Sequence, residues 1–190
     1  AGSGFLLKHG KKVYGITAKH VLFFAKTESM KTVSFGDELK SWTLRSVNSS
    51  SNNIKLGKLI NEDKEEVIAM PTKGDWLVFE IREALPKTAK VHSIRETPLK
   101  TGEEVFFMGF PYDSEEPVKV KGKFTGFTKD GNLSLNVPKG NYGGCSGGPV
   151  VDKNGDLVGI VSMGYFNKEL NKQIFEPASL DYFKQVIKAE

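Results

Sequence analysis

The sequence has little of the residue types that cross-link small domains or bind metals. Its 190 residues include one cysteine, so no disulfide can form within the chain. Only three histidines are present, scattered along the chain. One cysteine and so few histidines argue against a zinc site of the paired-cysteine type, and we expect neither a metal nor a cofactor. Stability must then come from packing.

Long apolar runs are also missing. The longest candidate, Val21 to Ala25, is far shorter than the roughly 18 residues that a spanning helix needs, so we expect no membrane span. Ala1 to Gly4 lack the charged region and apolar stretch of a targeting signal. A hydrophobic fraction of 38% and a mean hydropathy of −0.32 are typical of a globular protein with one large or two small cores.

The basic residues do not form a block. The net charge of +4 and the pI near 9.0 come from lysines along the whole chain, interleaved with acids as in Glu62-Asp63-Lys64-Glu65-Glu66. This interleaving indicates a solvated surface, and the chain has no basic stripe with intervening aromatic residues. We therefore expect no nucleic-acid partner.

Most of the chain reads as short strands separated by turns. Phe5 to Leu7 and Val13 to Ile16 flank a polar tip with a glycine, as in a β-hairpin, and Thr17 to Leu22 continues as a strand-like run. Further segments rich in β-branched or aromatic residues are 32–35, 42–47, 54–60, 66–69, 76–81, 105–108, 118–127, 133–137, 149–151, 157–163 and 173–175. Asn48 to Asn53 reads as a polar, mobile loop. The pattern predicts an all-β barrel or sandwich, with two joined barrels favoured.

The middle of the chain breaks this pattern. Arg82 to Thr101 contains two prolines and several lysines and suits a crossing between two halves. We place the first barrel at residues 1–85, the linker at 86–101 and the second barrel at 102–178. Only residues 179–190 have helical spacing, which predicts a C-terminal α-helix.

One glycine-rich stretch is suited to chemistry. Gly143-Gly144-Cys145-Ser146-Gly147-Gly148-Pro149 sets a serine among four glycines, as in a turn of tight backbone geometry. If the turn points Ser146 outward, the amides of Gly144 and Ser146 can converge on one point and bind a substrate carbonyl. A serine there needs a base to become a nucleophile.

Few residues can serve as that base and its partner. His9 lies at a hairpin tip and His92 in the linker, whereas His20 ends a strand-like run beside an apolar segment. Asp75 opens the most apolar strand of the first half, where its carboxylate could orient the imidazole. Taken alone, His20 reads as a structural histidine and Asp75 as a turn residue. The order His20, Asp75, Ser146 is that of chymotrypsin-like proteases and excludes the orders of subtilisins and α/β-hydrolases.

The whole chain resembles trypsin-like serine peptidases, and most closely the disulfide-free, bacterial HtrA-like branch. The blocks that carry the resemblance are Gly2 to Leu6, Ile16 to Val21, Gly74 to Val78, Gly102 to Pro111, Gly144 to Pro149 and Gly155 to Val161. The resemblance implies an all-β fold of two antiparallel six-stranded β-barrels of chymotrypsin type, followed by the C-terminal α-helix. It also favours an extracytoplasmic or secreted bacterial protein. HtrA proteins append a peptide-binding module, and we expect no regulation of this chain through one.

The resemblance also implies roles for single residues. Ser146 is expected to attack the scissile carbonyl, His20 to take and return its proton, and Asp75 to orient His20, while the amides of Gly144 and Ser146 form the oxyanion hole. Residues expected to bind the polypeptide substrate are Gly140, Asn141, Ser162, Met163 and Gly164. Ser162 falls on the strand that pairs with substrate backbone, and the others fall at the specificity pocket.

Cys145 departs from the pattern of zymogen-activated relatives. Those enzymes have an aspartate before the serine, which pairs with a newly cut N-terminus, so we expect no activation by that ion pair. Viral relatives use a cysteine nucleophile in a Gly-x-Cys-Gly block, but in that register Ser146 would occupy the place of the required glycine. Serine fits the block better, and Cys145 is expected to be a small side chain that faces inward.

No aspartate occupies the expected pocket base. An active peptidase should therefore prefer a small or medium apolar side chain over lysine or arginine at the cleaved position.

Two functions from different classes remain. The first is an active endopeptidase. The alternative is a catalytically silent or conformationally regulated domain that binds peptides or a partner protein. The intact set of His20, Asp75 and Ser146 favours the peptidase.

Overall fold

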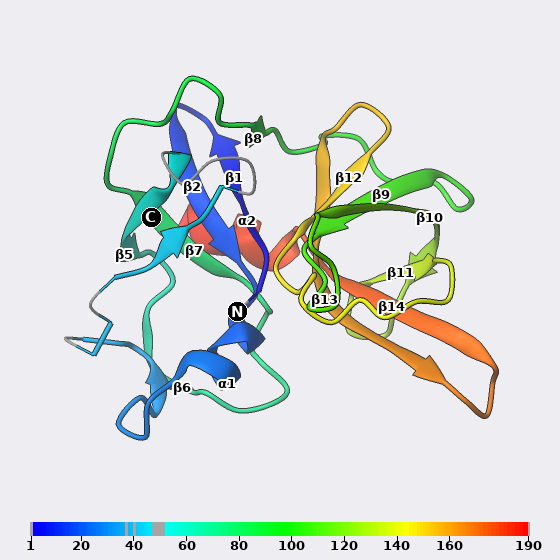
Figure 1. The fold of residues 1–190 in the computed structure, drawn as a ribbon, viewed down its shortest axis with the longest axis horizontal. Coiled ribbons are helices and arrows are strands. Elements are labelled where there is room, and N and C mark those ends of the chain that lie inside the picture. Colours follow the sequence, from blue (N-terminus) through cyan, green and yellow to red (C-terminus); the bar gives the residue numbers. More distant parts are fainter. Residues whose placement is uncertain (1, 37, 40, 47–51, 190) are drawn as a thin grey trace.

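The computed structural model describes residues 2–36, 38–39, 41–46 and 52–189. Two six-stranded sheets, antiparallel except for one parallel pair at the edge of the first, are each curved into a barrel-like shape and lie side by side (Figure 1). This arrangement confirms the fold predicted from the sequence. The predicted loop Asn48 to Asn53 and the end of the predicted strand at Val47 lie largely outside the described residues.

The first sheet uses strands from the first half of the chain. In spatial order they are β4 (Thr43–Leu44), β5 (Ile54–Leu59), β7 (Leu77–Ile81), β2 (Lys12–Thr17), β1 (Gly4–His9) and β8 (Val91–His92). A separate pair consists of β3 (Thr32–Val33) and β6 (Asp63–Val67). The hairpin of β1 and β2 continues through β7, because Thr17 pairs with Leu77. This register brings the end of β2 beside the start of β7.

The second sheet follows the linker. Its spatial order is β11 (Leu133–Asn136), β10 (Val118–Phe127), β9 (Glu104–Gly109), β12 (Pro149–Asp152), β13 (Leu157–Asn167) and β14 (Lys172–Ser179). Strand β13 extends beyond its predicted end at Met163, because Gly164 stays in register with Phe175 of β14. A Cβ at Gly164 would lie 2.8 Å from Cδ2 of Phe175, so the glycine allows close packing and does not end the strand.

Three short helical segments complete the fold. The 3-10 helix η1 (Lys19–Val21) and the α-helix α1 (Leu22–Ala25) follow β2, whereas α2 (Asp181–Lys188) ends the described chain. The expectation that the strand-like run continues to Leu22 is therefore wrong. The main-chain N–H of His20 donates to the side chain of Asp75, so this segment leaves the sheet ladder after Thr17. None of the described helices is long and apolar enough to cross a membrane.

Apolar packing forms one core inside each barrel and a third between them. The third core joins side chains of β1, β2 and β7 to side chains of β12, β13 and α2. Phe183 of α2 is fully buried and lies 5.5 Å from the ring of Trp76, whose Nε1 donates to the carbonyl oxygen of Ser179. In Figure 1, α2 (red) accordingly returns from the second barrel and passes behind the first.

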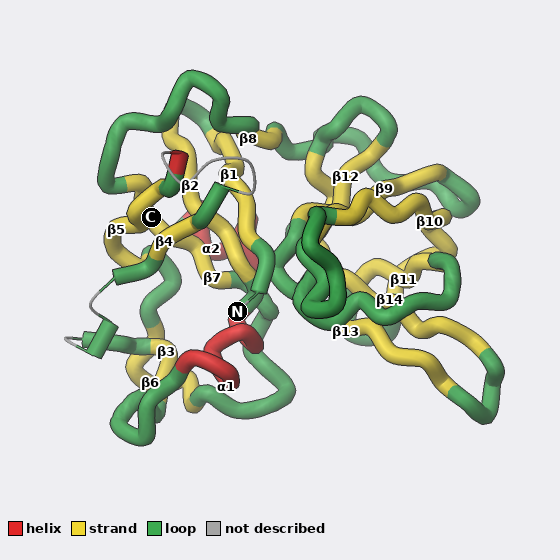
Figure 2. The backbone as a smooth tube through the Cα atoms, in the orientation of Figure 1, coloured by secondary structure: helices red, strands yellow, loops and turns green. Residues whose placement is uncertain are grey.

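The linker is more ordered than its composition predicts. Strand β8 adds to β1 in parallel, and Ile94 forms a bridge with Leu157 of the second sheet. His92 is 5% exposed, and its Nδ1 lies 3.1 Å from the carbonyl oxygen of Gly155. Figure 2 shows this segment passing from one group of strands to the other. The crossing is thus tied to both barrels.

The buried His92 predicts a pH dependence of stability. Burial, together with the charge of Lys90, lowers the pKa of His92 below its ordinary value of 6.5. The unfolded chain therefore binds a proton more readily, so this contribution is complete above pH 6.5 and is lost as the pH falls toward the lowered pKa. His92→Gln is expected to flatten the slope of unfolding free energy against pH below 6.5, measured by urea denaturation. Equal slopes in the two proteins would contradict this.

Candidate functional site

His20 and Asp75 meet where β2 ends and β7 begins. His20 Nδ1 lies 2.6 Å from Asp75 Oδ2, and the main-chain N–H of His20 donates to Asp75 Oδ1 at 2.8 Å. The Asp75 side chain is 8% exposed and the His20 side chain 16%. A carboxylate accepts hydrogen bonds, so this contact places a proton on Nδ1 and leaves Nε2 as the free basic nitrogen when the ring is neutral.

Asp75 also binds the second barrel. Ser162 Oγ of β13 donates to Asp75 Oδ2 at 2.5 Å, and Thr72 Oγ1 lies 3.5 Å from Oδ1. The sequence predicts a substrate-binding role for Ser162 but does not predict this contact with Asp75. Its one signal is a hydroxyl in the otherwise apolar run Val161-Ser162-Met163. The side chain of Ser162 thus helps to hold Asp75 across the boundary between the barrels.

Residues 143–148, the serine loop, have an almost fully hydrogen-bonded main chain. The N–H groups of Gly143, Cys145, Gly147 and Gly148 donate, in that order, to Asn141 Oδ1 and to the carbonyl oxygens of Tyr142, Val161 and Cys145. The carbonyl oxygens of Gly143, Gly144, Cys145 and Ser146 accept, in that order, from Tyr112 N, Ser3 Oγ, Gly148 N and Ser3 N. In the part of the chain that the structure describes, the N–H groups of Gly144 and Ser146 have no acceptor.

The two unbonded N–H groups are oriented by the carbonyl groups of the same peptide units. In a trans peptide the C=O and N–H point to opposite sides. The Gly143 carbonyl binds Tyr112 N at 2.9 Å and the Cys145 carbonyl binds Gly148 N at 2.8 Å, so the N–H groups of Gly144 and Ser146 point away from these partners. Gly144 has a φ of +98°, and a Cβ there would lie 2.4 Å from the carbonyl oxygen of Phe110. Only glycine fits this position.

Ser3 supports the serine loop from the first barrel. Its N–H donates to the Ser146 carbonyl at 2.8 Å and its Oγ donates to the Gly144 carbonyl at 2.9 Å. The same Oγ accepts from Phe110 N at 2.9 Å, and the Ser3 carbonyl accepts from Thr17 Oγ1 at 2.8 Å. Ser3 therefore connects the serine loop to β2 and to the end of β9.

Ser146 lies next to the segment that carries His20. A Cβ at Gly2 would lie 2.9 Å from the Ser146 carbonyl oxygen and 2.8 Å from Cγ2 of Val21, the residue after His20. Figure 1 shows the serine loop (yellow) at the boundary of the two barrels. No hydrogen bond between Ser146 Oγ and His20 is found among the described residues. The structure thus joins His20, Asp75 and Ser162 by hydrogen bonds and places Ser146 beside them by packing.

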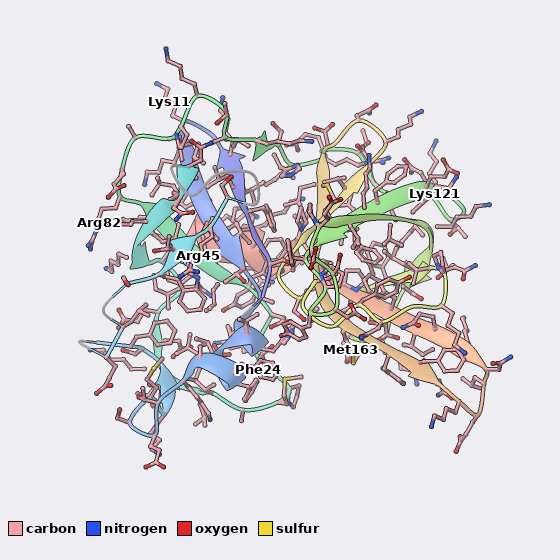
Figure 3. All side chains as sticks on the ribbon, in the orientation of Figure 1. Lys11, Phe24, Arg45, Arg82, Lys121 and Met163 are labelled. Carbon is pink, nitrogen blue, oxygen red and sulfur yellow. The ribbon has the colours of Figure 1, made fainter. Side chains whose placement is uncertain are left out.

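The residues expected at the specificity pocket lie around two aromatic rings. A Cβ at Gly140 would lie 2.8 Å from Tyr142, and Phe175 fills the space beside Gly164. The Phe175 ring is 2% exposed and lies 5.7 Å from the ring of Tyr142. Asn141 holds the serine loop through Gly143 and also donates to Asp113. In Figure 3, Met163, which is 41% exposed, lies near the boundary of the barrels, with Phe24 of α1 on the other side.

Cys145 faces inward, as predicted. Its side chain is fully buried, and a Cβ at Gly109 would lie 2.9 Å from its Sγ. Burial, and secondarily the charge of Asp113, raises the pKa of the Cys145 thiol to about 11. The thiol is therefore protonated near neutral pH. The described residues include no group of three or more histidine, cysteine or acidic side chains that could hold a metal.

The hydroxyl of Ser3 provides a test of the serine loop. Ser3→Ala is expected to slow the reaction of Ser146 with a fluorophosphonate about ten-fold, equivalent to about 1.4 kcal/mol, because the Gly144 carbonyl loses its donor. Ser114 is a matched control, since its Oγ also joins a carbonyl oxygen and an N–H, both of Glu116. Ser114→Ala should leave the rate unchanged, and a Ser3→Ala rate equal to that of the native protein would refute the role of Ser3.

Comparisons with known proteins identify the family and support the fold. The family model described as the trypsin-like peptidase domain matches residues 2–160. The serine endoprotease from Yersinia pestis is similar in structure, with a TM-score of 0.66 and 19% identity over 99% of this chain and 56% of that one. The inactive form of a serine-to-alanine mutant of Rv3671c from M. tuberculosis H37Rv has a TM-score of 0.62 and 16% identity over 98% of this chain and 80% of that one. No curated protein matches the sequence.

Proposed function

Since this chain belongs to the family of trypsin-like serine peptidases, we propose that it is a serine endopeptidase with Ser146 as nucleophile, His20 as base and Asp75 as orienting carboxylate. The observation that carries this proposal is the pattern of main-chain hydrogen bonds in the serine loop. The only two N–H groups of the described loop without an acceptor belong to Gly144 and Ser146. A preformed pair of donors at a serine is what an oxyanion hole requires.

The reaction follows from these roles. Ser146 Oγ attacks the carbonyl carbon of the scissile peptide while His20 Nε2 takes the hydroxyl proton. Asp75 keeps the Nδ1 proton in place and stabilises the imidazolium. His20 then gives the proton to the leaving amine, and an acyl-enzyme remains on Ser146. Water, deprotonated by His20, attacks the acyl carbon and releases the acid and free Ser146.

The free N–H groups of Gly144 and Ser146 are proposed to bind the oxyanion formed in both steps. Loss of one such donor typically costs about 3 to 4 kcal/mol of transition-state stabilisation. The loop carbonyls are already bonded on the opposite side, so the donors need no rearrangement when charge develops. Their orientation is supported by the N–H groups of Tyr112 and Gly148, which bind the carbonyls of Gly143 and Cys145 in the same peptide units.

We assign the substrate backbone to the free edge of β13. Strand β12 pairs with β13 only from Leu157 to Ile160, whereas β14 pairs with residues 163–167 of β13 on the other edge. An extended polypeptide can add to the unpaired edge at 162–164 by main-chain hydrogen bonds.

The proposed triad is divided between two barrels. We assign His20 and Asp75 to a first barrel of residues 1–85 and Ser146 to a second of residues 102–178, joined by a linker of residues 86–101.

We expect the specificity pocket to prefer small or medium apolar side chains. Tyr142 lies beside Gly140 and Phe175 beside Gly164, and we expect these rings to limit the length of the side chain that the pocket admits. Cleavage of a peptide library is expected to favour alanine, valine or a similar residue before the cleaved bond. Phe175→Ala should widen the preference toward larger apolar residues. Preferential cleavage of the library after lysine or arginine would contradict this assignment.

Covalent labelling tests the proposed nucleophile. A fluorophosphonate probe is expected to add once to the native protein, as read by intact mass, because an activated serine attacks phosphorus. Ser146→Ala should abolish the adduct and His20→Ala should reduce it at least a hundred-fold, the low end of the effect of a positioned base. Cys145→Ala should be labelled like the native protein, because that thiol is buried and protonated.

The same experiment distinguishes the second function class. If the native protein takes up no probe while it still binds unfolded polypeptides, the domain is a binding module and the catalytic assignment is wrong. An adduct that survives Ser146→Ala but not Cys145→Ala would place the nucleophile on the cysteine.

A further inference from the structure

Lys19, the residue before His20, is a buried cation. Its side chain is 1% exposed, although lysine is rarely buried unless paired. Its Nζ donates to both carboxylate oxygens of Glu66 at 2.8 Å and to the main-chain carbonyl of Lys73 at 2.7 Å, and it lies 3.3 Å from the hydroxyl of Tyr182. The ammonium group is thus fully surrounded by acceptors from three separate segments.

Glu66 completes this cluster. Its side chain is 8% exposed, and Oε1 also accepts from the N–H of Lys73 at 3.1 Å. Both polar groups of the Lys73 main chain are therefore bound by the Lys19–Glu66 pair. A buried ion pair contributes little net stability compared with apolar side chains of similar size. The main effect of the Lys19–Glu66 pair is therefore to fix the position of the Lys73 main chain.

The cluster fixes the main chain on both sides of the His20–Asp75 contact. Lys19 directly precedes His20 in η1, and Lys73 lies two residues before Asp75. Gly74, between Lys73 and Asp75, has a φ of +62°, and a Cβ there would lie 2.2 Å from Cγ of Tyr182. The turn that presents Asp75 is thus held by Lys19 and Glu66 and packed against Tyr182.

Tyr182 brings the C-terminal helix into the cluster. The Nζ of Lys19 lies 4.8 Å from the centroid of the Tyr182 ring, within the range of a cation–π interaction. Tyr182 belongs to α2, which is anchored by the buried Phe183 and by the hydrogen bond from Trp76 to Ser179. The position of α2 is therefore connected, through one ammonium group, to the segments that carry His20 and Asp75.

We propose that Lys19, Glu66 and Tyr182 are positioning residues that align His20 with Asp75 and make the alignment depend on the docking of α2. The proposal rests on the proposed peptidase function for its kinetic consequence, but its structural consequence is independent of it. Without the cluster, the hydrogen bond between His20 and Asp75 should still form, but the two side chains should be slightly displaced. A displacement of about 1 Å in an active site can lower a rate about a hundred-fold.

Glu66→Gln is the central variant, and Glu103→Gln is its matched control. Glu103 likewise binds one cation, Arg95, and one main-chain N–H, that of Lys100, but it lies in the second barrel away from His20. Both variants lose a paired carboxylate and should lower the melting temperature. Only Glu66→Gln is expected to slow fluorophosphonate labelling, by about ten- to a hundred-fold. Tyr182→Phe, which keeps the ring, should cause a smaller decrease.

An apolar pair separates positioning from stability. Lys19→Met combined with Glu66→Leu leaves no unpaired charge, so its melting temperature should recover relative to Lys19→Met alone. The labelling rate should stay low, because no group then binds the main chain of Lys73. Recovery of the rate together with the stability would overturn the proposal, as would equal rates in Glu66→Gln and Glu103→Gln.

A direct readout of the pair is the proton resonance of His20 Nδ1–H, which we expect to be strongly deshielded because Nδ1 lies 2.6 Å from Asp75 Oδ2. It is expected to shift or broaden in Glu66→Gln and to stay unchanged in Glu103→Gln. This measurement needs no activity. If the native protein is not labelled but the resonance responds as expected, the peptidase function fails and the positioning role stands. If labelling occurs and the resonance is the same in all variants, the positioning role fails.

Discussion

The site depends on the hydrogen bonds that the carboxylate of Asp75 accepts. It binds His20 through both the main-chain N–H and Nδ1, and it accepts a hydrogen bond from Ser162 in the other barrel. Three donors from two barrels thus converge on one buried side chain, which fixes the position of the carboxylate. It also explains why the chain leaves β2 after Thr17, since the amide of His20 is taken from the sheet to bind Asp75.

The serine loop shows how main-chain geometry alone can prepare a site. Hydrogen bonds from the N–H groups of Tyr112 and Gly148 hold the carbonyls of Gly143 and Cys145, and the N–H groups of Gly144 and Ser146 lie on the opposite side of the same peptide units. Glycine is required where the loop passes close to other main chain. At Gly147 a Cβ would lie 2.3 Å from the carbonyl oxygen of Ser3, and at Gly148 it would lie 1.9 Å from that of Met108. The glycines predicted for chemistry are thus equally needed for packing.

The sequence predicts the two-barrel fold and the C-terminal helix, because strand and helix patterns can be recognised within a short segment. It also predicts the candidate site residues, because the glycine-rich turn is a local pattern and the order His, Asp, Ser can be read along the chain. It does not predict contacts between distant segments. Ser162 reads as a substrate-binding residue and Lys19 as one of many solvated lysines, yet their partners are 87 and 47 residues away. The sequence also does not predict the helical turn at His20, because a short apolar run has no period that separates strand from helix.

Catalysis by Ser146 requires oxyanion donors, and among the described residues the N–H groups of Gly144 and Ser146 are free before any substrate binds. The most direct measurement is a pair of crystal structures, of the free protein and of its Ser146 adduct with a peptide aldehyde. The account predicts that the serine loop superimposes in the two structures and that the adduct oxygen lies about 2.7 to 3.1 Å from the amide nitrogens of Gly144 and Ser146. A Gly143–Gly144 peptide that is flipped in the free protein, or an adduct oxygen that contacts neither amide, would contradict it.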